Sequence, residues 1–88
     1  MWIIRLLDSN TRYEQYVRES FYDGALLYFI YEEDAVRLAV LLSKTTKPCF
    51  GVQCVAQRYV SGSRKERLKR IESSQIDRIH KHLLASLN

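Results

Sequence analysis

The chain has 88 residues, of which 47% are hydrophobic and 27% charged. This length suits one domain and excludes two, and the composition is that of a folded chain rather than a disordered one. Residues 1–60 carry seven basic and seven acidic side chains, whereas residues 61–88 carry seven basic and three acidic ones, which accounts for the whole net charge of +4. Attraction to a polyanion should therefore be directional.

The first segment, 2-WIIRLL-7, predicts a strand with apolar residues on both faces. Arg5 interrupts it and Asp8 ends it, so it is too short for a signal peptide or a membrane span. The run 8-DSNT-11 predicts a turn. It leads into 12–20, which is read as a second strand, with a short helix as the alternative because its alternation is imperfect.

The middle of the chain predicts a strand, a helix and a long strand. The run 25-ALLYFIY-31 is apolar on both faces, which is typical of a central strand. Three acids at 32–34 suit the start of a helix, and 35–44 continues as a helix with apolar residues almost all round, so we expect it to be heavily buried. Residues 49–60 predict a strand. Its expected core face comprises Phe50, Val52, Cys54 and Ala56.

The last third predicts a basic helix over about 63–87. Two pairs resemble N-terminal capping boxes, Ser63 with Glu66 and Ser74 with Asp77, so the helix either runs through 73–74 or breaks there. In a continuous helix, four cations gather opposite the apolar side. They are Arg67, Arg70, Arg78 and Lys81.

These elements follow the order β-β-β-α-β-α. We expect a single α+β domain over 1–88, a two-layer sandwich with one mostly antiparallel sheet of about four strands and two helices on one face. The run 24-GALLYFIYEEDAVRLAVLL-42 resembles the third strand and second helix of an RNA recognition motif. It lacks that motif's leading basic residue and second glycine, and the element order departs from β-α-β-β-α-β, so the family is not assigned.

Catalytic and cofactor chemistry finds little support in the sequence. The glycines are isolated, which excludes a phosphate-binding glycine loop. His80 and His82 point roughly 200° apart on a helix, and Cys49 and Cys54 are ~16 Å apart along a strand, beyond disulfide reach. We expect no metal, no cofactor and no enzyme activity. The cysteines are read as buried free thiols in a reducing, intracellular (cytoplasmic) compartment.

The leading hypothesis is a non-catalytic module that binds nucleic acid or a ribonucleoprotein. Its expected phosphate contacts are Arg64, Lys65, Arg67, Lys69, Arg70, Arg78 and Lys81. The alternative is a protein-interaction regulator or inhibitor, of viral or phage type, that binds an acidic or nucleic-acid-binding surface of a partner; a solvated helix face also accounts for the charge.

The sheet face away from the helices is a further candidate surface. It should carry Ile3, Arg5, Leu7, Tyr28, Val55 and Tyr59. Tyr28 and Tyr59 are candidates for stacking on bases, and the face suits a homodimer or a partner protein unless segment 12–23 covers it. The sequence does not distinguish DNA, RNA and protein as the partner.

Overall fold

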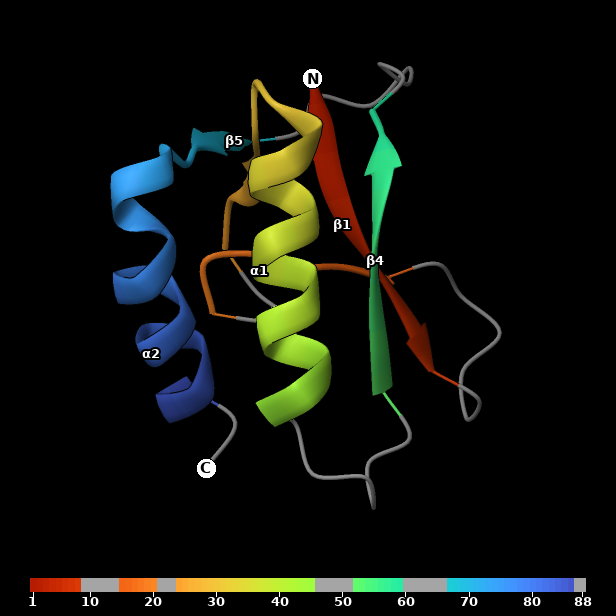
Figure 1. Cartoon of the computed structure of the whole chain (residues 1–88), viewed down its shortest axis with the longest axis vertical. Helices are drawn as coiled ribbons and strands as arrows, with labels where there is room; N and C mark the ends of the chain where they lie inside the picture. Colours follow the sequence, from red (N-terminus) through yellow and green to blue (C-terminus); the bar gives the residue numbers. More distant parts are fainter. Residues whose placement is uncertain (9–14, 21–23, 46–51, 60–66, 87–88) are drawn as a thin grey trace.

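The computed structural model describes residues 1–8, 15–20, 24–45, 52–59 and 67–86, and the chain is α+β, as predicted. Figure 1 shows helices α1 and α2 side by side, with α1 next to strands β1 and β4. The strands are β1 (Trp2–Asp8), β2 (Gln15–Tyr16), β3 (Leu26–Tyr28), β4 (Val52–Arg58) and β5 (Leu68–Arg70). The helices are α1 (Glu32–Thr45) and α2 (Ile76–Ser86), with a 3-10 turn over Ser73–Gln75 before α2.

The strands form two small sheets instead of the single sheet expected from the sequence. β1 lies between β2 and β4 and is antiparallel to both, whereas β3 and β5 form a parallel pair. Two antiparallel bridges join the sheets in the described ranges. In the first, the N–H groups of Trp2 and Phe29 each donate to the carbonyl of the other residue at 2.8 Å. In the second, Arg18 lies opposite Leu26, and the N–H of Leu27 donates to the carbonyl of Val17 at 3.3 Å. The predicted strand over 25–31 is therefore shorter, and Ile30 and Tyr31 are exposed.

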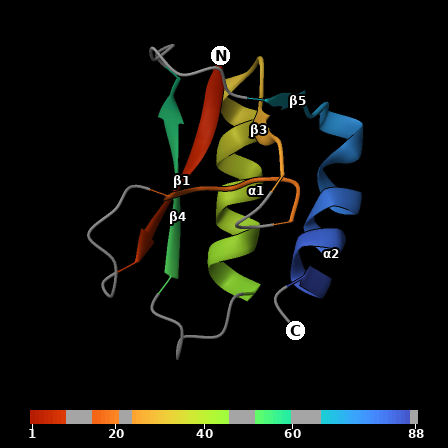
Figure 2. The same cartoon turned by 180° about the vertical axis from the view of Figure 1, so that it is seen from behind.

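Helix α1 covers one face of β1 and β4 (Figure 1), and Figure 2 shows the opposite face of these strands. Its side toward the sheet is apolar and fully buried, through Leu38 and Leu42. The expectation that α1 is heavily buried is wrong for its outer side, because Val36 is 42% exposed and Val40 is 44% exposed. The sheet covers one side of α1 and α2 another, so the outer side faces solvent.

A serine of α1 fastens the helix to β4. The hydroxyl of Ser43 donates to the carbonyl of Cys54 at 3.2 Å and accepts from the N–H of Cys54 at 3.0 Å. Within the described chain β4 is an edge strand of its sheet, so at this point its outward backbone groups are satisfied by a side chain instead of a neighbouring strand.

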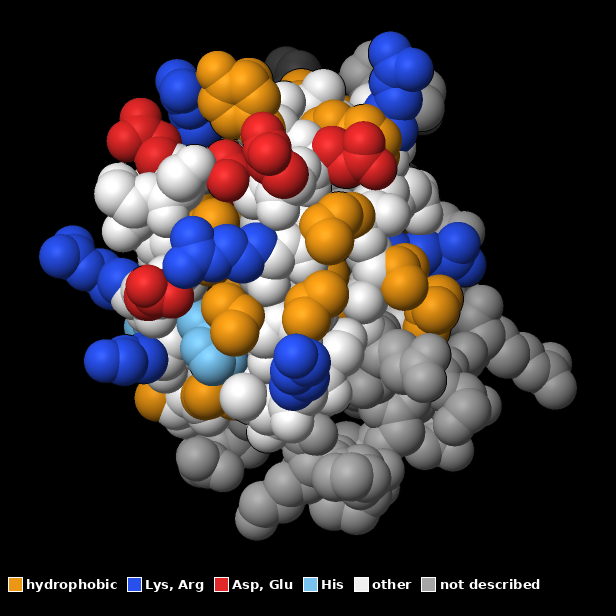
Figure 3. All heavy atoms as spheres, in the orientation of Figure 1, with side chains coloured by type: hydrophobic (Ala, Val, Ile, Leu, Met, Phe, Trp, Pro, Cys, Tyr) orange, Lys and Arg blue, Asp and Glu red, His pale blue; other side chains and the backbone are white. Residues whose placement is uncertain are grey.

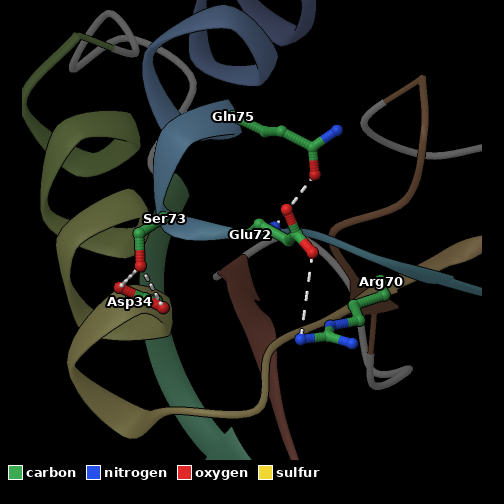
Figure 4. Close-up of polar contacts among 5 residues, drawn as sticks. All are labelled: Asp34, Arg70, Glu72, Ser73 and Gln75. Atoms are coloured by element: carbon green, nitrogen blue, oxygen red, sulfur yellow. Dashed lines mark hydrogen bonds and ion pairs between the residues drawn. The ribbon is translucent and has the colours of Figure 1, made fainter.

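The predicted helix over 63–87 is corrected by the structure, although residues 63–66 lie outside the described ranges. Leu68–Arg70 is a β-strand, and helix α2 begins only at Ile76. The chain thus breaks at 73–74, which was one of the two alternatives. The N–H of Glu72 donates to Oε1 of Gln75 at 3.0 Å, so the turn is closed two residues earlier than the Ser74 pairing suggested (Figure 4).

Helix α2 packs beside α1, and polar contacts join the two near the start and at the end of α1. Near the start of α1, the hydroxyl of Ser73 donates to both carboxylate oxygens of Asp34 at 2.8 Å (Figure 4). At the end of α1, the hydroxyl of Thr45 lies 3.0 Å from Nε2 of His80. The apolar side of α2 is buried, through Ile76, Ile79 and Leu83. Neither helix has the length and apolar character needed to cross a bilayer in the described ranges.

The hydroxyl of Ser43 yields a test of the contact between α1 and β4. Ser43→Ala should lower the free energy of unfolding by about 1–2 kcal/mol, because both backbone groups of Cys54 lose a partner. Urea denaturation followed by circular dichroism measures the change. Ser74→Ala is the matched control: Ser74 is exposed, and its substitution should change stability by less than about 0.5 kcal/mol. Equal effects of the two changes would contradict this role of Ser43.

Candidate functional site

The predicted basic residues do not share one helix face. Arg64 and Lys65 lie outside the described residues, Lys69 and Arg70 lie on β5, and Arg67 directly precedes it. Arg78 and Lys81 lie on α2, and all five described cations are exposed. The four-residue stripe expected from a continuous helix is therefore wrong, because the strand at Leu68–Arg70 separates its two halves.

The alternation of β5 sends its two cations to opposite faces. In the parallel pair, Lys69 aligns with Leu27 and Arg70 aligns with Tyr28. Leu27 is fully buried, whereas Tyr28 is only partly buried. Since neighbouring residues of a strand point to opposite sides, Lys69 faces the α2 side and Arg70 faces away from it.

A groove of about 430 Å³ lies where β5, α2 and the segment after β2 meet. Its apolar floor comes from Ile71 and Ile79, which are 3% and 8% exposed. The rest of its lining is polar or charged: Glu19, Ser20, Lys69, Gln75, Arg78 and His82. The groove thus combines a hydrophobic floor with a rim rich in hydrogen-bond donors, and Lys69 and Arg78 are its two fixed positive charges.

Among the described residues that line the groove, Glu19 is the one carboxylate, and its surroundings favour the ionised form. The N–H of Ala25 donates to Oε2 of Glu19 at 3.3 Å, and Nζ of Lys69 lies 3.4 Å from Oε1. These hydrogen bonds lower the pKa of Glu19 below its ordinary value of 4.5, and the positive charges of Lys69 and Arg67 lower it further. Arg67 therefore contributes positive charge at this end of the groove.

Gly24 lies close to the side chain of Glu19, in a backbone conformation that favours glycine. Gly24 has φ of +88°, in the left-handed region. A Cβ on this residue would lie 3.0 Å from Oε2 and 3.1 Å from Cβ of Glu19. The turn before β3 therefore favours glycine for its backbone conformation, and any other side chain would also have to push Glu19 slightly aside.

Arg78, the groove cation on α2, is less neutralised by nearby acidic side chains than Lys69 is. Arg78 and His82 are four residues apart, so they lie one turn apart on one helix face, and both line the groove. In the described chain no carboxylate lies within ion-pair distance of Arg78, whereas Lys69 pairs with Glu19 and Arg70 lies 3.9 Å from Glu72 (Figure 4). Arg78 is thus the groove cation most available to an external anion.

The two candidate stacking residues lie away from the groove. Tyr28 lies opposite Arg70 in the parallel pair of strands. Tyr59 directly follows β4, and its N–H donates to the carbonyl of Met1 at 2.9 Å. Both rings are partly buried. The structure therefore does not bring Tyr28 or Tyr59 together with Lys69 and Arg78.

The sheet face away from α1 is only partly open. By register Ile3 and Leu7 share this face with Val55. Ile3 is buried, but Leu7 is 38% exposed and Val55 is 39% exposed. Of the predicted cover, segment 12–23, only residues 15–20 lie within the described ranges.

The environment of Cys54 makes its thiol a poor nucleophile. Cys54 is a buried free cysteine, and burial raises its pKa to about 11 despite the hydrogen bond with Ser43; Cys49 lies outside the described residues. Among the residues that the structure describes, no group of three or more His, Cys, Asp or Glu side chains is placed to hold a metal ion.

Sequence patterns could locate part of this groove but not its composition. Lys69 and Arg78 were expected from charge alone. Glu19, Ser20 and Gln75 were not expected. The tertiary fold brings them to the groove, and no local sequence pattern indicates that they lie near Lys69 and Arg78. His82 was read only as a surface residue. Its spacing of four from Arg78 was the available signal.

Comparison with protein-family models, with curated proteins and with solved structures found no match for the chain. The interpretation of the groove therefore rests on its own chemistry.

The raised pKa of Cys54 predicts slow modification of this thiol. In a Cys49→Ser variant, the reaction of Cys54 with a disulfide reagent at pH 8 should be at least ~100-fold slower than that of a free cysteine, because only about one thiol in a thousand is ionised at a pKa of about 11. Absorbance of the released thiolate measures the rate. The same reaction in denaturant should reach the ordinary rate, and equal rates in both conditions would contradict the burial of Cys54.

The lowered pKa of Glu19 predicts a pH-dependent contribution to stability. The folded pKa lies below the ordinary 4.5, so the stabilisation by the charged carboxylate is present above the unfolded pKa and is lost as pH falls through the folded pKa. Wild type should therefore be more stable than Glu19→Gln at pH 7, and the difference should vanish in acid. Gln retains an oxygen for the N–H of Ala25, so the comparison isolates the charge. A difference that persists at pH 2 would contradict it.

Proposed function

We propose that the chain is a non-catalytic binding module that contacts nucleic acid through the groove between β5 and α2. The observation that carries the proposal is the convergence of Lys69 and Arg78 on one hollow with an apolar floor. Cations that line a groove attract a phosphate backbone and release its counterions. An apolar floor suits the face of a base or sugar better than a fully wet surface does.

The polar rim suits contacts to phosphate and sugar oxygens. Arg78 offers several N–H donors in a planar group, and the side chains of Gln75 and Ser20 offer neutral donors beside it. Such contacts position a backbone and carry no sequence information directly. We therefore propose binding that depends strongly on salt and weakly on sequence.

Glu19 limits this affinity and makes it selective. Its carboxylate neutralises part of the charge of Lys69 at 3.4 Å, so an incoming phosphate competes with it for the ammonium group. A small anion that displaces Glu19 from Lys69 gains little binding free energy, because it replaces one ion pair with another. A polyanion gains more, because it contacts several cations at the same time. The residues of the chain thus favour a polymeric ligand over a single small anion.

A protein-interaction regulator is the second candidate, and the exposed apolar residues of the sheet favour it. Leu7 and Val55 lie on the face away from α1 and are 38% and 39% exposed. Apolar side chains that gather on one face are typical of surfaces that contact other proteins. This function predicts a complex that survives nuclease treatment.

Removal of the groove cations tests the nucleic-acid proposal. Lys69→Gln with Arg78→Gln should weaken binding of a fluorescein-labelled single-stranded oligonucleotide ~25-fold at 0.1 M salt, and it should lower the slope of log K against log salt by ~1.4, since each contact to single strands contributes about 0.7. Fluorescence anisotropy at several salt concentrations measures both quantities.

The matched control removes two exposed cations far from the groove lining. Lys44→Gln with Arg58→Gln changes net charge equally but should lower affinity by less than about threefold, which is the share of long-range attraction. Glu19→Gln should strengthen binding, because it removes the competing carboxylate. Equal losses in the two double variants, or no binding by wild type to DNA or RNA, would refute the groove as the nucleic-acid site.

A further inference from the structure

A row of exposed residues on the outer side of α1 is not used by the proposed function. It consists of Glu33, Val36, Val40 and Lys44, here named the α1 stripe. The spacings of three, four and four residues place them on one face of the helix, and all four are exposed. The valines are 42% and 44% exposed, in a helix whose opposite side is fully buried. The α1 stripe therefore has an apolar centre with an acid at its start and a base at its end.

Figure 3 shows this arrangement on the surface. Acidic side chains gather over the start of α1, hydrophobic side chains follow along its middle, and a basic side chain lies over its end. The apolar area extends past the start of α1, because Tyr31 is 60% exposed and lines a shallow depression together with Glu33 and Val36.

From this polarity we infer that the α1 stripe is a self-association surface, on which the helices α1 of two copies of this chain pack antiparallel around a two-fold axis. An axis midway between Val36 and Val40 places Val36 of one copy against Val40 of the other, twice by symmetry. The same register brings Glu33 within one residue, ~1.5 Å along the helix, of Lys44 of the second copy. The two ion pairs and two valine contacts form together, and the helix dipoles oppose each other favourably.

A second copy fits the α1 stripe better than a foreign partner because the stripe is complementary to itself. In a second copy that runs antiparallel, the order of the stripe is reversed. Its base then lies opposite the acid of the first copy, and the two apolar centres face each other. Arg37, at the border of the stripe, lies 3.7 Å from Asp77 of α2, which neutralises part of its charge. The association rests on α1 alone and is independent of the groove between β5 and α2.

Sedimentation velocity of the purified chain tests the inference. The interface is small, so wild type should shift from monomer to dimer between about 10 µM and 1 mM. Val40→Lys should raise the dimer dissociation constant at least tenfold. Val55→Lys is the matched control on the sheet face, with similar exposure, and should leave the constant within about twofold. Circular dichroism verifies that both variants are folded.

The charge pair gives a sharper test of the antiparallel register. Glu33→Lys and Lys44→Glu should each weaken self-association at least fivefold, because each places like charges opposite one another in both pairs. When the two variants are mixed, opposite charges should again face each other in both pairs, so heterodimers should form with nearly wild-type affinity. Labelling one variant with a fluorophore measures this directly.

The remaining outcomes overturn the inference. A wild-type chain that stays monomeric at 1 mM has no such surface. A dimer that survives Val40→Lys but is lost in Val55→Lys uses the sheet face instead of α1. Single charge variants that associate as wild type does, or whose mixture shows no gain over each alone, exclude the antiparallel register.

Discussion

The groove depends on the backbone bridges that join the two sheets, the first of which lies between Trp2 at the start of β1 and Phe29 just after β3. Each residue donates its N–H to the carbonyl of the other, and the Phe29 side chain is fully buried beneath them. This bridge and a second one, between Arg18 and Leu26, attach the parallel pair to the main sheet. β5 carries Lys69, and α2 follows β5 in the chain, so both walls of the groove are positioned through these bridges. A change that separates Trp2 from Phe29 would remove one of the two attachments without touching any charged residue of the groove.

The long elements were predictable because each carries its own signal. β1 and β4 combine high strand propensity with enough length to show which residues face the core, and α1 combines an acidic start with apolar residues at helical spacing. The strand β5 carries no such signal. Its three residues are all exposed, so they show no alternation of burial, and Leu, Lys and Arg are good helix formers. Pairing with β3 overrides that local preference, and only the tertiary structure records the pairing.

The site was predictable as a region but not as a surface. The excess of positive charge in the last third named Lys69 and Arg78 as candidates for anion contact, and both line the groove. A helical wheel then assigned Arg70 and Arg78 to one face, whereas the strand sends Arg70 to the side of Tyr28. The carboxylate of Glu19 comes from a distant part of the sequence, and hydrogen bonds to it depend on a turn that the sequence marks only by Gly24. Charge counts thus report how much charge a segment has, and backbone geometry decides which charges act together.

The turn at Gly24 affects the charges of the groove through its contact with Glu19. Any other amino acid there would face a strained backbone at φ of +88° and a tight contact with Glu19. A substitution at position 24 would therefore push the Glu19 side chain aside and change the distance between its carboxylate and Lys69, which is now 3.4 Å. Gly24 thus influences the charge balance of the groove, although it has no side chain of its own.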